Sequence, residues 1–307
     1  MSALDLRNRA VVLTGASGGI GSALTAELVA AGARVIAVGR DHARLQRLVA
    51  AHPRDAVVAV AADVATAEGR TTISAAARAQ NASLLLIAHA QAAFGMFEAQ
   101  DAAALEHTLH TNLVAPMLLI HALLPILRAH ATTAAPAAVV AIGSTFGSLA
   151  YPGFAAYSAS KYGLRGLIEG LHREYADSAL RFQYLAPRAT RTGFNSAAVD
   201  AMNRELKVAH DAPDAVAKML RVAIERGTPR KQLGWPEALF VRINALLPGV
   251  IDRNLKAQLP VVRRHAAVAA SQATPASSPT ASHSVSHPAA HSASTVLVEV
   301  PHETATP

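Results

Sequence analysis

The sequence has no cysteine in its 307 residues, and it is poor in aromatic and charged side chains. The absence of cysteine excludes a disulfide framework, a thiolate nucleophile, an iron–sulfur cluster and a Cys-ligated zinc site, and we expect no metal centre. Charged residues make up only 16% of the chain and hydrophobic residues 51%. The chain can therefore bury a large core, which excludes disorder of the whole protein.

Acidic residues are also few, 21 against 28 basic ones, and the formal net charge is +7. A basic protein suits an anionic cofactor or an acidic partner, but its charge says nothing about its fold. The basic residues are scattered, aromatic residues are only 4%, and no zinc-finger or RNA-recognition signature is present. We therefore expect no binding of nucleic acid.

Long hydrophobic runs are missing as well. The longest one, Leu113 to Leu127, contains His121 and two prolines and falls short of the about 20 residues that a membrane span needs. It predicts a buried helix. The apolar run from Ala10 to Leu13 is too short for a signal peptide, and a cytoplasmic protein is expected.

Short apolar runs alternate with helix-length segments along most of the chain, which predicts a parallel sheet covered by helices on both faces. The candidate strands are Ala10–Thr14, Arg34–Val38, Val57–Ala61, Leu84–Ala88, Ala138–Ile142 and Phe182–Leu185. The fold class is therefore α/β, a doubly wound parallel sheet of Rossmann type. We expect this single catalytic domain over residues 5–234, an amphipathic helical extension over 235–265, and a disordered tail rich in Ala, Ser, Pro and His over 266–307.

A glycine-rich loop follows the first candidate strand and precedes a helix. Its glycines have the spacing G-x-x-x-G-x-G, which lets the backbone turn tightly and approach a pyrophosphate at the positive end of the helix. The loop therefore predicts a dinucleotide site with the residues Gly15, Ser17, Gly19, Ile20 and Gly21.

The end of the second candidate strand bears on the choice of cofactor. An NAD site would place an acid there to hold the ribose 2′-hydroxyl, but the chain has Gly39 and Arg40. Arg40 offers a permanently charged group to a 2′-phosphate, which favours NADPH over NADH. After the third strand, Asp63 and Val64 are candidates for contact with the adenine.

A second group of residues carries the expected acid–base chemistry. Tyr157 and Lys161 are four positions apart and share one face of a helix, so the ammonium can lie beside the phenol. A neighbouring cation is expected to lower the pKa of the phenol by favouring phenolate. Ser144, at the end of a strand, can stabilise the oxygen of a substrate carbonyl.

These residues together resemble the short-chain dehydrogenase/reductase family over about residues 5 to 250. The resemblance implies that Tyr157 is the proton donor, that Lys161 binds the nicotinamide ribose and assists the phenol, and that Ser144 orients the carbonyl. Asn112 matches the asparagine that holds a water for proton relay. The resemblance also implies a homo-oligomer through the long helices beginning near Leu113 and Tyr157.

Two loops depart from the family's pattern. Ala88-His89-Ala90-Gln91 stands where relatives carry Asn-Asn-Ala-Gly, and Pro187-Arg188 where they carry Pro-Gly. We expect Ala90 and Thr192 to contact the cofactor still, although Arg188 weakens the second assignment. His89 could be mistaken for a catalytic base, but a ring that packs locally in a structural turn is favoured.

The loops expected around the substrate are aromatic and apolar: 94–97, 146–154 and 193–194. They indicate a lipophilic ketone, either a small molecule or one bound to an acyl carrier, whose acidic surface would suit the basic protein. The same residues could instead close the core or a dimer contact. The expected activity is NADPH-dependent reduction of a ketone, and the alternative is a dinucleotide sensor or scaffold without turnover.

Residues 235–265 read as a basic amphipathic helix pair. Leu239, Phe240, Ile243 and Leu246 recur at helical spacing, and basic residues flank the second stretch. Such a pair can lie on an anionic membrane surface as a peripheral contact, or pack onto its own protein or a sister subunit.

Overall fold

A computed structural model of the chain describes residues 4–273. They form a seven-stranded parallel sheet with the strand order β3-β2-β1-β4-β5-β6-β7. The strands are β1 (Ala10–Thr14), β2 (Arg34–Gly39), β3 (Val57–Ala61), β4 (Ala82–Ile87), β5 (Ala137–Ile142), β6 (Leu180–Ala186) and β7 (Arg230–Gln232). The strand order reverses between β1 and β4, and in such sheets ligands bind outside the carboxyl ends of the strands at this point.

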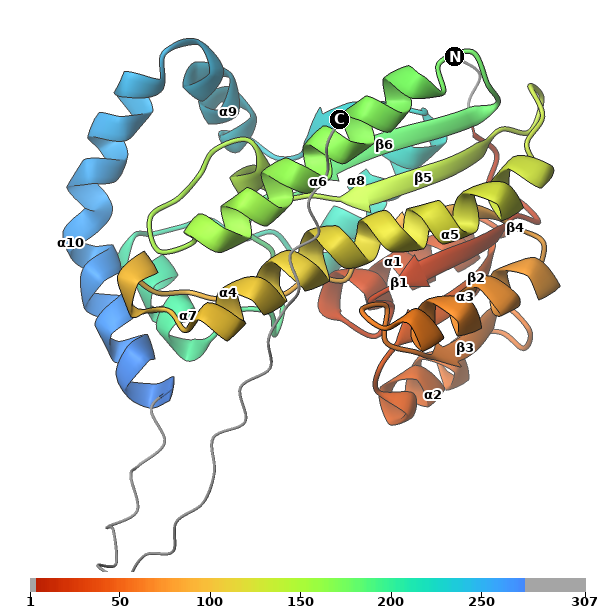
Figure 1. Cartoon of the computed structure of the whole chain (residues 1–307), viewed down its shortest axis with the longest axis horizontal. Helices are drawn as coiled ribbons and strands as arrows, with labels where there is room; N and C mark the ends of the chain where they lie inside the picture. Colours follow the sequence, from red (N-terminus) through yellow and green to blue (C-terminus); the bar gives the residue numbers. More distant parts are fainter. Residues whose placement is uncertain (1–3, 274–307) are drawn as a thin grey trace, which may run out of the picture. The chain divides into compact units, whose positions relative to one another are not determined.

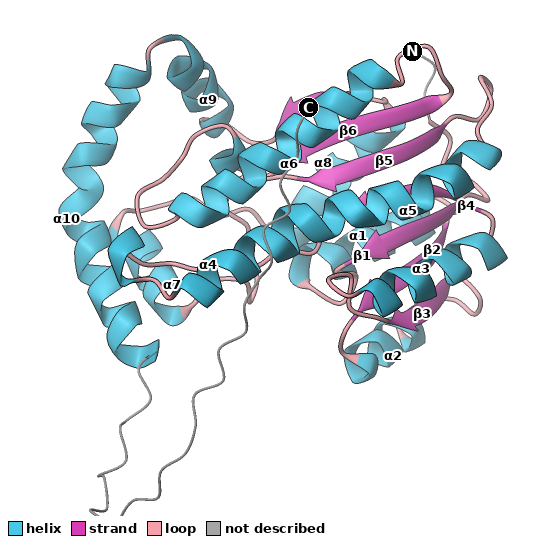
Figure 2. Ribbon diagram, in the orientation of Figure 1, coloured by secondary structure: helices cyan, strands magenta, loops and turns pink. Residues whose placement is uncertain are grey.

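Helices cover both faces of the sheet (Figures 1 and 2). One layer contains α3 (Ala67–Ala79), α5 (Ala115–Ala129) and α6 (Ala155–Glu174), and the other contains α1 (Gly19–Ala30), α2 (His42–Ala50) and α8 (Pro213–Glu225). Each layer buries its own hydrophobic core against the strands. Leu119 and Leu123 belong to the first core and Leu24 and Leu220 to the second. A fully buried side chain of this kind contributes about 1.5–3 kcal/mol.

This arrangement confirms the predicted doubly wound sheet, and the six predicted strands appear with ends shifted by at most two residues. The edge strand β7 was not predicted, because its residues Arg-Lys-Gln lack an apolar pattern. It pairs only with β6, from Tyr184 to Ala186, and lies at the edge of the sheet. An edge strand is not buried on both faces, so it does not require a continuous apolar run.

The apolar run around Leu113 lies in a helical segment that is longer than predicted. The helix α4 (Ala102–Leu109), a π-helical turn (His110–Val114) and α5 follow one another without interruption. Among the described residues, Ala102–Ala129 is long and apolar enough to cross a membrane by length and composition alone. In this structure, however, α5 packs on the sheet with Leu119, Leu123 and Leu127 fully buried, as predicted for a core helix.

Three further helices lie at the carboxyl side of the sheet: α7 (Ala197–Glu205), α9 (Glu237–Leu246) and α10 (Pro248–Ala273). The α10 helix packs against α7 and α9 (Figure 1). It extends eight residues past the predicted boundary at 265, so residues 266–273 are helical rather than part of a disordered tail. Their richness in alanine, the best helix former, explains the difference. The rest of the predicted tail lies outside the described residues.

Candidate active site

The glycine loop lies between β1 and α1 and is closely packed. Gly15 has a positive φ of +67°, and a Cβ there would lie only 2.7 Å from the backbone nitrogen of His89. A Cβ on Gly21 would collide with the carbonyl oxygen of Gly15. Side chains other than hydrogen are therefore excluded at both positions. The α1 helix has no side-chain cap and no acidic residue in its first turn, so its N-terminal N–H groups are available to an anion.

The structure also places the other residues predicted for the loop, and their contacts with a cofactor stay predictions. The Ser17 hydroxyl lies 3.2 Å from the position that a Cβ on Gly39 would take, which brings the loop close to the end of β2. The side chain of Ile20 packs into the core beneath α1, so only its backbone faces the loop. The Thr192 side chain contacts Gly19, where a Cβ would collide with it. The predicted residues of β1, β2 and the β6 loop are therefore brought together.

Arg40 follows β2 and has no ion-pair partner among residues 4–273. The neighbouring Asp41, which could compete for a ribose hydroxyl, caps α2 instead: its carboxylate accepts a hydrogen bond from the backbone N–H of Arg44 at 2.9 Å. The same carboxylate forms an ion pair with the Arg44 side chain at 3.3 Å. Arg40 is thus free to meet an anionic group, whereas Asp41 is already engaged.

Asp63 and Val64 follow β3 at the same edge of the sheet. The Asp63 carboxylate accepts a hydrogen bond from the N–H of Ala65 at 2.9 Å, and the Val64 side chain is buried in the core. Ala90 lies on the loop after β4, next to His89. The structure therefore fixes the positions of all three, and their contacts with a cofactor stay predictions.

Ser144, Tyr157 and Lys161 meet at the carboxyl end of β5. Ser144 follows this strand, and its hydroxyl interacts with the phenol of Tyr157. Lys161 is only 2% exposed, and its ammonium donates a hydrogen bond to the carbonyl of Ile142 at 3.2 Å. The ammonium nitrogen lies 5.8 Å from the centre of the Tyr157 ring. The i,i+4 spacing on α6 thus brings the cation to the ring as predicted.

The predicted lowering of the phenol pKa is wrong for this structure. Burial raises the pKa of Tyr157 to about 12, and only the hydrogen bond with Ser144 opposes this rise. Burial also lowers the pKa of Lys161 to about 8. The ammonium lies over the ring and bonds to the Ile142 carbonyl instead of the hydroxyl, so desolvation of the phenolate outweighs the attraction of the cation.

Asn112 lies in the π-helical turn and is fully buried. Its carboxamide accepts a hydrogen bond from the N–H of Gln91 at 2.8 Å and donates one to the Gln91 carbonyl at 2.7 Å. It also donates to the Ser160 hydroxyl at 3.1 Å, and that hydroxyl donates to the carbonyl of Tyr157. Asn112 therefore links the loop after β4 to the helix that carries Tyr157. Its role in holding a water stays a prediction.

His89 has the local packing that was favoured over a role as a base. Its Nε2 lies 3.2 Å from the carbonyl of Thr111 and its Nδ1 lies 2.7 Å from the Thr14 hydroxyl. A carbonyl can only accept, so Nε2 carries the proton and Nδ1 accepts from the hydroxyl of Thr14. Burial lowers the pKa of His89 to about 4, so the ring is neutral near pH 7. It joins the end of β1 to the π-helical turn.

Arg188 has a structural task that the sequence analysis missed. Its guanidinium donates two hydrogen bonds to the carboxylate of Asp211, at 2.8 and 2.6 Å, and one to the carbonyl of Trp235 at 2.8 Å. It also forms an ion pair with Glu237 at 3.4 Å. The Asp211 carbonyl in turn accepts from the N–H of Arg191 at 2.9 Å, next to Thr192. The only sequence signal was that Arg188 stands where relatives carry glycine. In the sequence this departure weakens the assignment of Thr192, whereas in the structure Arg188 holds the loop in place.

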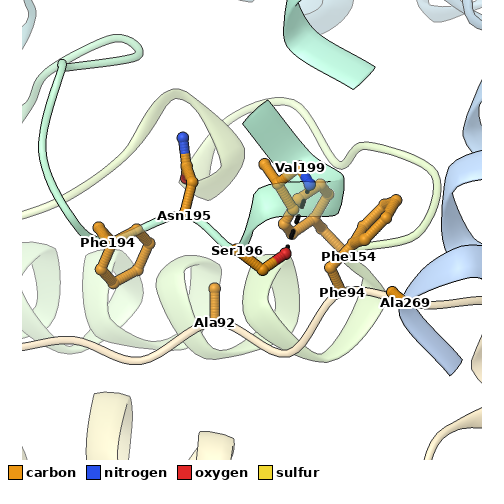
Figure 3. Close-up of a pocket in the computed structure, with 8 residues that line it drawn as sticks. All are labelled: Ala92, Phe94, Phe154, Phe194, Asn195, Ser196, Val199 and Ala269. Atoms are coloured by element: carbon orange, nitrogen blue, oxygen red, sulfur yellow. Dashed lines mark hydrogen bonds between the residues drawn. The ribbon is translucent and has the colours of Figure 1, made fainter. Parts of the chain in front are cut away.

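A pocket of about 210 Å³, with both aromatic and polar residues in its lining, lies near Tyr157 (Figure 3). Phe194 lies on one side of it, and Phe94 and Phe154 lie on the other with their ring centres 5.0 Å apart. The remaining lining residues are Ala92, Asn195, Ser196, Val199 and Ala269. The Phe194 ring centre lies 6.1 Å from that of Tyr157, so the pocket adjoins the phenol.

The aromatic residues also pack among themselves, as the second interpretation expects, and their contact with a lipophilic substrate stays a prediction. Phe146 stacks on Tyr151, and Phe154 is tilted against both rings. These rings belong to a cluster with Tyr157 and Val262 of α10, and Val262 is fully buried. The α10 helix contributes Val262 to this cluster and Ala269 to the pocket. Neither contribution was predicted, because no local pattern relates these residues to loops far earlier in the chain.

Comparisons with known proteins agree with this geometry. The sequence profile described as "short chain dehydrogenase" matches residues 9–203. Oxidoreductase claN of Passalora fulva is 31% identical over 187 residues, which cover 61% of this chain and 84% of that protein.

Solved structures give the same fold. A short-chain dehydrogenase from Streptomyces avermitilis superposes with a TM-score of 0.69 at 29% identity, covering 83% of this chain and 98% of that one. A short-chain dehydrogenase from Burkholderia cenocepacia in complex with NADP superposes with a TM-score of 0.70 at 22% identity, covering 82% and 99%.

Proposed function

Because the chain belongs to the short-chain dehydrogenase family, we propose that it uses NADPH to reduce a lipophilic ketone to an alcohol. Family membership makes it an oxidoreductase that uses a nicotinamide cofactor and acts between a CH–OH group and a carbonyl. The observation that carries the narrower proposal is the meeting of Ser144, Tyr157 and Lys161 near a pocket that three phenylalanines line.

The residues present fit a dinucleotide. The close packing at Gly15 and Gly21 and the uncapped start of α1 leave backbone N–H groups for a diphosphate, and Arg40 is free for a 2′-phosphate. Thr192 and Ala90 are the candidates for contact with the nicotinamide half. When bound, the cofactor supplies a hydride to the carbonyl carbon of the substrate.

The protein's own part in the reaction is the movement of one proton. The raised pKa of Tyr157 keeps its hydroxyl protonated at neutral pH, so it can give this proton to the carbonyl oxygen. The Ser144 hydroxyl orients that oxygen. The ammonium of Lys161, over the ring, stabilises the phenolate that remains. Asn112 and Ser160 hold the first turn of α6 in place through the Tyr157 carbonyl.

The decisive experiment compares the wild-type protein with Tyr157→Phe. NADPH oxidation is followed with a panel of lipophilic ketones and ketoacyl thioesters. We expect a loss of about 10²–10⁴-fold in kcat, the usual contribution of a general acid, with unchanged affinity for NADPH. Tyr162→Phe, on the exposed side of the same helix, is the matched control and should keep its activity.

Binding of NADPH without turnover of any compound by the wild-type protein would contradict the proposal. It would favour the alternative, a dinucleotide sensor or scaffold. The presence of Asn112, Ser144, Tyr157 and Lys161 together favours the enzyme, because a protein that only binds a dinucleotide has no use for a proton donor.

Preference for NADPH has its own test, the variant Arg40→Ala. A charged hydrogen bond contributes about 1.5–3 kcal/mol, so kcat/KM for NADPH should fall about 10- to 100-fold while that for NADH changes little. Arg44→Ala is the control, since Arg44 is engaged by Asp41. Equal losses with both cofactors would refute the role of Arg40.

The pocket and the basic protein leave two forms of substrate within this proposal: a small lipophilic ketone and a ketone bound to an acyl carrier. We further propose a cytoplasmic homo-oligomer that associates through the long helices. Residues 235–265 are the candidate for peripheral contact with an anionic membrane.

A further inference from the structure

The corner between α9 and α10 consists only of apolar residues, and all of them are exposed. The segment 245–250 reads Ala-Leu-Leu-Pro-Gly-Val. Leu246 is 79% exposed, Leu247 62% and Val250 53%. The corner is the turn where the two helices meet in Figure 1. Single exposed apolar side chains are common, but six consecutive apolar residues at a turn indicate a surface that contacts something other than water.

Basic side chains lie on both sides of this corner. Arg242 precedes it on α9, and Arg253 and Lys256 follow it on α10. All three are exposed and have no ion-pair partner among the described residues. Of the two nearby acids, Glu237 is engaged by Arg188, which leaves Asp252 alone against three cations. The corner is therefore an apolar tip with a basic rim, complementary to an anionic lipid surface.

Residues 4–273 leave this corner uncovered. No residue of α9 is buried, whereas the far half of α10 packs through Val262 and Ala266. A second copy is the less favourable occupant, because a two-fold contact would bring the same three cations of both copies together. Another exposed apolar face, on the long helices with Leu109, Met117 and Leu118, is available for self-association.

We propose that the α9–α10 corner inserts into the surface of an anionic bilayer. Leu246, Leu247 and Val250 enter the acyl region, and the basic rim meets the phosphates of the headgroups. Because α10 runs from this corner to Ala269 at the pocket, the helix connects the membrane surface to the site. Delivery of a lipophilic substrate along this route rests on the proposed function, whereas the membrane contact does not.

The test is flotation of the full-length protein with lipid vesicles. The wild-type protein should float with vesicles of phosphatidylcholine and phosphatidylglycerol, and much less with phosphatidylcholine alone. The triple variant Leu246→Ser, Leu247→Ser and Val250→Ser should lose most of this binding. Val268→Ser removes an exposed apolar side chain farther along α10 and should float like the wild type.

A second variant separates charge from apolar contact. Arg253→Glu with Lys256→Glu should weaken binding to the anionic vesicles about tenfold or more, since each cation contributes about 1 kcal/mol near such a surface. Circular dichroism and thermal unfolding of every variant verify the fold.

Three outcomes would overturn the inference: no flotation of the wild-type protein, equal flotation of the triple variant, or a smaller particle in light scattering when the corner is changed without lipid. The last would identify a second copy as the occupant. Flotation needs no turnover, so vesicle binding by a protein that reduces no ketone would refute the proposed function and leave the membrane contact standing.

Discussion

Lys161 carries its charge at a position that water barely reaches. Its ammonium has one hydrogen bond to a carbonyl and lies near an aromatic ring, without a carboxylate partner among the described residues. Burial of a cation in such surroundings is costly, and the cost appears as the lowered pKa of about 8. The buried ammonium therefore lowers the stability of the fold but places a cation beside the phenol.

This cost predicts a dependence of stability on pH. The pKa of Lys161 falls from 10.5 in the unfolded chain to about 8 in the folded protein. Between these values the unfolded chain binds more protons, so the folded state gains stability as pH rises. Relative to Lys161→Met, the free energy of unfolding of the wild type should rise by about 3 kcal/mol over this interval.

Urea unfolding of both proteins across the interval measures the difference, and contributions of the buried tyrosines cancel in it. The exposed Lys218, changed to Met, is the control for the loss of a lysine at the surface. A flat difference for Lys161 would mean that water reaches the ammonium more freely than its burial indicates.

The sequence predicted which residues form the catalytic group but not their protonation. Tyr157, Lys161 and Ser144 follow from helical spacing and from the end of a strand. Burial raises the pKa of the phenol, and the rings around it are Phe146 and Phe154 from the loop after β5 and Phe194 from the loop after β6. The spacing of residues along the chain does not predict which rings bury the phenol of Tyr157.

At the scale of elements, the loop after β6 is held by ion pairs with residues outside the loop. Arg188 joins it to Asp211 and to the start of α9, and Thr192 on this loop lies against the glycine loop. The side chains of Arg188 and Asp211 are only 16% and 17% exposed, so the pair is stronger than a surface ion pair.

Arg188→Met should therefore destabilise the protein by about 2 kcal/mol, because Asp211 and Glu237 would keep their charge without a partner. The KM for the cofactor should rise more than kcat falls, since the loop with Thr192 loses its anchor. Chemical unfolding and steady-state kinetics measure the two effects. Arg188→Lys, which lacks the forked geometry, should restore them in part, and Arg54→Met on an exposed loop should change neither.

Unchanged unfolding and kinetics in Arg188→Met would show that the loop holds its shape without this network. The sequence could not reveal the network, because its members are 23 and 49 positions apart. The strands, by contrast, were predictable, since a strand buried on both faces has a continuous apolar run.

At the scale of the whole molecule, a second exposed apolar surface lies on the helices, away from the α9–α10 corner. The residues Leu109, Val114, Met117 and Leu118 lie on the long helix, and Tyr162 lies on the neighbouring α6. On α6, Gly166 and Gly170 have open space where a Cβ would be, so another helix can approach closely there. These are the helices through which the expected homo-oligomer would form.

Met117→Glu combined with Leu118→Glu should break this association, because it places four like charges in a two-fold contact. Light scattering after size-exclusion chromatography should then give a smaller particle than the wild type. Val58→Glu, an exposed apolar residue on β3, is the control and should leave the particle unchanged. An unaltered mass for the double variant would mean that the subunits meet elsewhere.

The two hydrophobic cores lie on opposite faces of the same strands. Along β1, Val12 belongs to one core and its neighbours Val11 and Leu13 to the other. Loss of one helical layer exposes one face of strands whose other face supports the second layer. The sheet therefore unfolds cooperatively, as one unit. The α9 helix buries no residue and is held instead by polar contacts, among them the Arg188–Glu237 ion pair and the hydrogen bond from Asn244 to the Ser148 carbonyl, so it adds little to this coupling.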